Sequence, residues 1–112
     1  MDDKNYLNAR REIKFLFSKT YDFLLSLDDS SVARINRSLS LLEKYGNTAA
    51  YPHTKYLAQG IFELRVIGVK HIRIFFVYRN DEVMVLHALI KKTNKIPKKE
   101  IDYVLQLKKR LR

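Results

Sequence analysis

The sequence predicts an α+β fold: an antiparallel sheet, two N-terminal helices packed on one of its faces, and a C-terminal helix. Two observations support this class. Apolar side chains recur at helical spacing over residues 20–46, whereas over residues 61–79 they alternate, as they do in half-buried strands. Helices and strands also come in separate blocks, which favours antiparallel pairing over a parallel sheet.

The first half of the chain is predicted to hold one strand and two helices. REIKFLFS (11–18) mixes aromatic and aliphatic residues, which is typical of a short strand. Thr20 is placed to cap a short helix that runs through Leu27. A second helix follows the cluster of N-cap candidates at 28–31 and ends at Gly46. Its apolar residues are spaced by three or four positions: Val32, Ile35, Leu39 and Leu42.

The second half is predicted to be a loop, a three-stranded meander and a helix. Residues 47–60 contain a proline and mixed polarity, so we expect a loop there. Strands follow at 61–68, 71–79 and 83–90, and the last is apolar on both faces, as an interior strand is. Pro97 marks the start of the last helix. Four side chains of that helix are expected to be buried: Ile101, Val104, Leu105 and Leu111.

Composition predicts one soluble domain, 1–112, with an anionic partner. The chain is 46% hydrophobic and 30% charged, contains no cysteine, and has neither a secretory signal nor an apolar run of membrane-spanning length. We therefore expect a cytoplasmic protein. The net charge of +10 is uneven: residues 1–50 hold eight basic and seven acidic side chains, and residues 51–112 hold fourteen and five. Such a lopsided field favours an anionic ligand, and nucleic acid is the usual one.

Two arginines within the predicted hairpin are the most informative residues. Arg65 and Arg73 each lie in an otherwise apolar strand, and hairpin pairing would place them side by side on the face opposite the two helices. Guanidinium groups bind phosphate through two parallel hydrogen bonds. The alternative is that either arginine forms an ion pair with Glu63 on a solvated sheet face. Two arginines on one face, beside a lysine-rich strand end, favour phosphate binding.

Lysines follow the third strand of the meander. Lys91 and Lys92 stand where its apolar pattern stops, and are either positioned cations or part of a solubilising turn. Lys95 lies in the turn, where it could contact an RNA backbone. Lys98 and Lys99 begin the last helix, where positive charge opposes the helix dipole. They are therefore exposed at small cost or present for an anionic partner.

The three histidines have no metal-binding spacing, and we expect no metal or cofactor. His53 is predicted to lie in the loop before the hairpin, where it could serve as an acid or base. His71 begins a strand and is expected to be exposed. His87 falls within the interior strand, and a partly buried structural role is favoured there over catalysis.

Several segments together resemble a known family. IFELR (61–65), Arg73 and HALIKKTNKIPKKEI (87–101) resemble the RelE/ParE toxin superfamily, in particular its HigB-type branch with phage-derived homologues. The helix VARINRSLSLLEKYG (32–46) and the PHTKYL segment (52–57) extend the resemblance over nearly the whole chain. It implies a RelE-like fold and the toxin half of a type II toxin–antitoxin system.

The resemblance also implies an activity and a set of partners. Such toxins are ribosome-dependent mRNA endoribonucleases that inhibit translation and need no metal. The implied partners are the ribosome, mRNA and a cognate helix-turn-helix antitoxin of the HigA type, with operator DNA bound only through the antitoxin complex. A topoisomerase-directed, ParE-like toxin remains an alternative, because fold does not decide function. A non-catalytic RNA-binding or ribosome-binding domain is the other.

Site residues carry over from the resemblance by motif. Arg65 would contact the phosphate and Arg73 would stabilise the transition state, while Lys91 or Lys92 would complete the basic pocket. Glu63 would orient Arg65 or act as the base. The RNA-binding residues would be His53, Lys55, Lys95, Lys98 and Lys99. Some relatives place a tyrosine or histidine near the C-terminus in the site; the nearest candidate is Tyr103, so the general base stays open.

Overall fold

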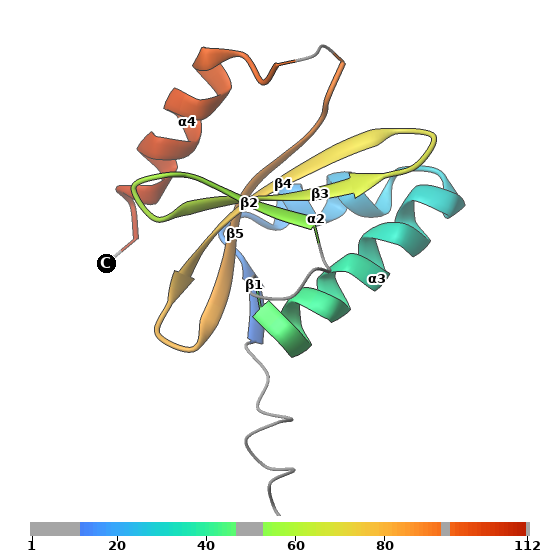
Figure 1. The fold of residues 1–112 in the computed structure, drawn as a ribbon, viewed down its shortest axis with the longest axis horizontal. Helices are drawn as coiled ribbons and strands as arrows, with labels where there is room; N and C mark the ends of the chain where they lie inside the picture. Colours follow the sequence, from blue (N-terminus) through green and yellow to red (C-terminus); the bar gives the residue numbers. More distant parts are fainter. Residues whose placement is uncertain (1–11, 47–52, 93–94, 112) are drawn as a thin grey trace, which may run out of the picture.

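The computed structural model describes residues 12–46, 53–92 and 95–111, which form one five-stranded sheet with three helices (Figure 1). The α+β class is therefore confirmed. In chain order the described elements are β1 (Glu12–Phe15), α2 (Ser18–Leu25), α3 (Asp29–Tyr45), β2 (His53–Ala58), β3 (Ile61–Ile67), β4 (His71–Arg79), β5 (Glu82–Ile90) and α4 (Lys98–Lys108).

The sheet is mixed, which corrects the expectation of a purely antiparallel sheet. Its strand order is β1-β5-β4-β3-β2, and the three pairs from β2 to β5 are antiparallel. Strand β1 runs parallel to β5, with Ile13 opposite Val83. A parallel pair needs a long crossover, and everything between β1 and β5 supplies it. The residues of a four-residue strand do not reveal the direction of its partner.

The predicted loop 47–60 is wrong for residues 53–58, which form the edge strand β2; residues 47–52 lie outside the described residues. An edge strand carries polar side chains on its open side, so its composition resembles that of a loop. Gln59 and Gly60 connect β2 to β3, and both have positive φ (50° and 83°), as a tight two-residue hairpin turn requires.

The two early helices begin and end near the predicted positions. Helix α2 starts at Ser18, so Thr20 lies inside it as a buried residue and does not cap it. Helix α3 is capped by Asp28, whose carboxylate accepts from the Ser31 backbone N–H at 3.1 Å, and it ends at Gly46 with φ of 71°.

Each face of the sheet has its own apolar core. Helices α2 and α3 cover one face, as predicted; the buried side chains there are Leu24, Ile35, Leu42, Leu64, Val66, Ile72, Ile74, Phe76, Val83, Val85 and Ala88. Helix α4 packs on the other face, where the buried set is Ile61, Phe75, Val77, Met84, Leu86, Val104 and Leu107. The sheet is thus the middle layer between two helical layers (Figure 1).

A β-bulge in β5 determines which residues reach the α4 side. Phe76 pairs with Val85 but Phe75 pairs with His87, so Leu86 is an extra residue. Without it, strict alternation would turn His87 and the residues two and four positions later toward α2 and α3. With it, both Leu86 and His87 face α4, beside Phe75.

None of the helices in the described part of the chain is long and apolar enough to cross a membrane.

Candidate active site

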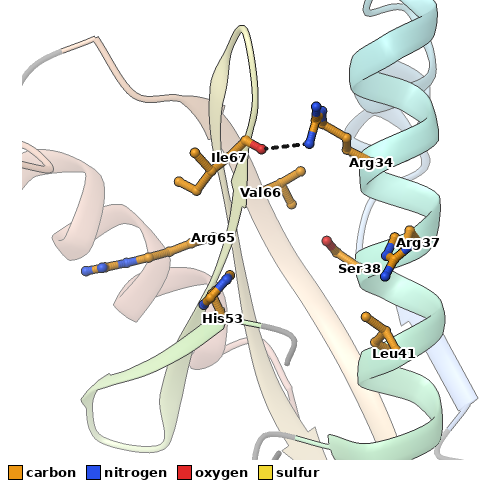
Figure 2. Close-up of a pocket in the computed structure, with 8 residues that line it drawn as sticks. All are labelled: Arg34, Arg37, Ser38, Leu41, His53, Arg65, Val66 and Ile67. Carbon is orange, nitrogen blue, oxygen red and sulfur yellow. Dashed lines mark hydrogen bonds between the residues drawn. The ribbon is translucent and has the colours of Figure 1, made fainter. Parts of the chain in front are cut away.

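A row of three basic side chains crosses the sheet on the α4 side. In the register, His53 of β2 lies opposite Arg65 of β3, which lies opposite Arg73 of β4. Directly paired residues of antiparallel strands project from the same face, so these three side chains are neighbours. We call His53, Arg65 and Arg73 the arginine row. Figure 2 shows the Arg65 side chain extending away from α3, toward the side on which α4 packs.

Glu63 holds both arginines of the row. Its side chain is 3% exposed, and its two carboxylate oxygens face different guanidinium groups. Arg65 Nε donates to Oε1 at 2.9 Å, and Arg73 Nε lies 3.6 Å from Oε2. The ion pairs of the alternative interpretation are therefore present, but they lie at a largely buried site and not on a solvated face. A carboxylate in this position fixes the direction of both guanidinium groups.

The two arginines differ sharply in exposure. The Arg65 side chain is 39% exposed, whereas that of Arg73 is only 5% exposed. Arg73 Nη1 donates to the Ile72 carbonyl at 3.2 Å, and its buried Nε has no hydrogen-bond partner. Burial lowers the pKa of Arg73; the Glu63 carboxylate opposes this and the Arg65 charge adds to it. We expected the face opposite the two early helices to present both arginines and Glu63 at the surface. This is wrong for Arg73 and Glu63, which are buried, and α4 packs on this face too.

The predicted loop residues belong to β2. Lys55 lies opposite Glu63, so it projects from the same face as the arginine row and is exposed. His53 is exposed at the end of the row. Their expected proximity to Arg65 therefore follows from strand pairing and not from a loop folded over the site.

The lysines after β5 line a cavity of about 190 Å³ between the strand end and the start of α4. We call it the lysine cavity. The Lys91 backbone N–H donates to the His71 carbonyl at 2.6 Å, so β4 still holds the chain at this point. The residues around the cavity are Leu89, Ile90, Lys91, Lys92, Lys95, Ile96, Pro97 and Glu100.

Two of the predicted RNA-binding lysines belong to neither the arginine row nor the lysine cavity. Lys98 and Lys99 are the first residues of α4 and are exposed. The Lys98 ammonium lies 3.7 Å from the Asp102 carboxylate, one helical turn away. Neither residue lines the lysine cavity.

The structure adds an acid–base cluster that the strand pattern did not indicate. His87 Nε2 lies 3.0 Å from Glu100 Oε1, and the Tyr103 ring packs edge-on against the imidazole at 5.0 Å. The His87 side chain is 23% exposed, so solvent and ligands can reach it. A polar residue at an interior-strand position was the available signal, but the position of α4 was needed to find its partner.

Metal chemistry has no evident site in this arrangement. Among residues 12–46, 53–92 and 95–111, no group of three or more histidine and acidic side chains is placed to hold a metal ion. The groups gathered here are cations, with one buried and one partly exposed carboxylate. Such a set can bind a phosphodiester and stabilise charge that develops on it.

A family model of phage-derived Gp49-like proteins matches residues 22–109. The chain belongs to this family. The match covers α3, the strands β2 to β5 and α4, and therefore includes the arginine row, the lysine cavity and the acid–base cluster. No curated protein is similar enough to the Gp49-like chain to match it.

Two solved structures share its fold. The YoeB dimer from Staphylococcus aureus has 18% sequence identity and a TM-score of 0.57, covering 76% of this chain and 99% of YoeB. YoeB in the YoeB–YefM complex from the same organism has 17% identity and a TM-score of 0.55, with the same coverage. The Gp49-like chain thus has a YoeB-like fold.

Proposed function

We propose that this Gp49-like protein is the toxin of a type II toxin–antitoxin system, of the HigB type, and that it cleaves mRNA on the ribosome. The observation that carries the proposal is the arginine row, in which one exposed and one buried guanidinium are fixed by a single buried carboxylate. Membership of the Gp49-like family and the YoeB-like fold support it.

The proposed reaction uses the RNA as its own nucleophile. The 2′-hydroxyl oxygen attacks the adjacent phosphorus, the bond from phosphorus to the 5′-oxygen breaks, and the products carry a 2′,3′-cyclic phosphate and a 5′-hydroxyl. Arg65, the exposed arginine, binds a non-bridging phosphate oxygen. Arg73, buried beside it on β4, stabilises the added negative charge, because a buried charge is poorly screened.

Glu63 is proposed to position the arginines and not to act as the base. Both of its oxygens face guanidinium groups, so accepting a proton would weaken two ion pairs. We propose that His87 accepts the 2′-hydroxyl proton instead, since it projects from the same face and is held by Glu100, and that the departing 5′-oxygen takes its proton from solvent. Lys91 and Lys92 would hold the neighbouring backbone from the lysine cavity.

The proposed partners are the ribosome, mRNA and a helix-turn-helix antitoxin of the HigA type that binds operator DNA in the complex. One solved relative, YoeB, has been captured with YefM, which supports a partner protein for this fold. The net charge of +10 supports an anionic target.

Induced expression in bacteria tests the function. We expect growth arrest, with mRNA fragmented inside translated regions, and loss of both with Arg73→Ala. Arg110→Gln is the matched control, because Arg110 is an exposed arginine at the end of α4, over the Phe17 ring. DNA damage with intact mRNA would instead indicate a topoisomerase-directed toxin. Salt-sensitive RNA binding without cleavage would indicate a non-catalytic domain.

A further inference from the structure

A second basic cavity lies on the other side of β3, between that strand and helix α3. Its volume is about 380 Å³. We call it the α3 pocket; Figure 2 shows the residues that line it, which are Arg34, Arg37, Ser38, Leu41, His53, Arg65, Val66 and Ile67. No acidic side chain is among them. Because Arg65 pairs with Glu63 and extends to the opposite side of the sheet, the unneutralised arginines of the pocket are Arg34 and Arg37.

The helix supplies two of these cations in a defined geometry. Arg34 and Arg37 are three residues apart on α3, so they project from neighbouring positions on one side of the helix. Arg34 Nη1 donates to the Ile67 carbonyl at 3.3 Å, which holds it against the end of β3 (Figure 2). Neither arginine forms an ion pair with an acidic residue in the described ranges.

Gly68 leaves the space that Arg34 occupies. A Cβ atom at this position would lie 2.7 Å from both Cδ and Nε of Arg34. Any residue larger than glycine therefore forces the arginine to move. This provides a way to displace the guanidinium without changing the charge of the protein.

The α3 pocket shares two residues with the arginine row, although the Arg65 side chain itself extends to the other side of the sheet (Figure 2). His53 and Arg65 belong to the row and also line the pocket, at the edge of the sheet where β2 begins. A chain that crosses the row from Arg73 to His53 thus leads to the pocket. A ligand long enough to follow this path carries regularly spaced negative charges, as a nucleic acid strand does.

We propose that the α3 pocket binds a second phosphodiester of the same RNA strand, with Arg34 and Arg37 as its ligands. The inference rests on the proposed function and extends it, because it defines where the RNA runs outside the cleavage site. The strand passes over the edge of the sheet, so RNA of a few nucleotides fills only the arginine row, and longer RNA fills both.

Binding of non-cleavable RNA to the free protein, residues 1–112, tests this. The probes are 2′-O-methyl oligouridylates of three and eight nucleotides. We expect Arg34→Gln/Arg37→Gln to weaken binding of the longer RNA roughly 10-fold, the value of one charge-assisted contact, and to leave the shorter one unchanged. The slope of log K against log salt should fall by about 0.7, the value for one phosphate on a single strand.

Two further variants make the result specific. Lys19→Gln/Arg110→Gln removes the same charge from exposed sites beside the Phe17 ring and should leave binding of both RNAs unchanged. Gly68→Ala should weaken only the longer RNA, by a few-fold, without a charge change. A double arginine variant that binds the longer RNA like the wild type, or a control that loses as much affinity, overturns the inference.

The outcome is separable from that of the proposed function. If the arginine variants bind the eight-nucleotide RNA as tightly as the wild type, the inference about the α3 pocket fails, but the proposed mRNA cleavage is unaffected. Conversely, length-dependent RNA binding by a protein that cleaves no mRNA on ribosomes contradicts the proposed function and not the α3 pocket.

Discussion

The arginine row and the lysine cavity are both basic and both lie toward α4, but they are built in different ways. The row rests on regular pairing of β2, β3 and β4, with Arg65 directly opposite Arg73. The cavity depends on the bulge at Leu86 and on the placement of α4, which contributes Glu100. The regularly paired part thus holds the arginines proposed to bind the phosphate and stabilise its charge, and the part with the bulge holds the lysines proposed to bind the neighbouring backbone.

The largest expected effect contrasts the buried with the exposed arginine. Arg73→Ala should lower the cleavage rate by about 10²–10³-fold, since it removes a preorganised charge. It should also lower the free energy of unfolding by about 1–3 kcal/mol, because buried Glu63 loses one partner. Arg65→Ala should lose similar activity. It should also lower the free energy of unfolding, because Glu63 loses its 2.9 Å hydrogen bond, but by less than Arg73→Ala, because the Arg65 side chain is 39% exposed and its removal leaves no buried cavity. Single-turnover cleavage and urea unfolding measure both; equal stability losses would contradict the difference in burial.

The acid–base cluster gives the next largest effect. His87→Gln should lower the cleavage rate about 10²-fold, as expected when a general base is lost. A base must be neutral to accept a proton, so wild-type activity should fall toward acidic pH and the variant should lose this dependence. His71→Gln, an exposed histidine at the start of β4, is the control. A lower rate with an unchanged pH profile would indicate a structural role for His87.

A smaller effect separates the lysines of the cavity from those of the helix start. Lys91→Gln/Lys92→Gln should lower the cleavage rate about 10-fold at saturating ribosomes, because both residues line the cavity. Lys98→Gln/Lys99→Gln removes the same charge from exposed positions and should mainly raise KM. If the two double variants lowered the cleavage rate equally, Lys91 and Lys92 would contribute only general attraction between the basic protein and RNA.

The smallest effect concerns the scaffold. Hydrogen bonds from Lys70 and then from Ser31 hold the pKa of Asp28 well below its usual range. A carboxylate whose pKa is lowered by folding stabilises the fold at pH values above its pKa in the unfolded chain. This stabilisation is lost as the pH falls toward the lower pKa of the folded protein. The Tm should therefore drop as the pH is lowered from 5 toward 2. Asp28→Asn should have a lower Tm at pH 7 and a flatter profile; an unchanged profile would contradict the Asp28 interaction.

The features that the sequence revealed are those set by local pattern. Alternation in β3 and β4 predicted that Arg65 and Arg73 share a face, and register confirms it. Helix spacing, the N-cap candidates at 28–31 and Gly46 predicted α3, and Asp28 is the candidate that caps it. These depend on residues close in the chain, so a single sequence suffices to read them.

The features it did not reveal depend on partners distant in the chain. One extra residue, Leu86, reverses the direction of every later β5 side chain, and nothing in VMVLHALI marks it. Alternation placed Glu63 and Arg73 on one face but did not indicate that both are buried there, at 3% and 4% exposed, on a face where α4 also packs. Arg34 and Arg37 look like ordinary exposed helix residues until β3 is placed beside them. The proposed roles of all site residues stay predictions.

The most direct test of the account is the chemistry of the RNA ends. Ribosomes programmed with a defined mRNA are mixed with wild-type protein, Arg65→Ala or Arg110→Gln. The account predicts a single cut by wild type and Arg110→Gln, with a 2′,3′-cyclic phosphate and a 5′-hydroxyl, and almost none by Arg65→Ala. Full cleavage by Arg65→Ala, or ends with a 5′-phosphate, would contradict it.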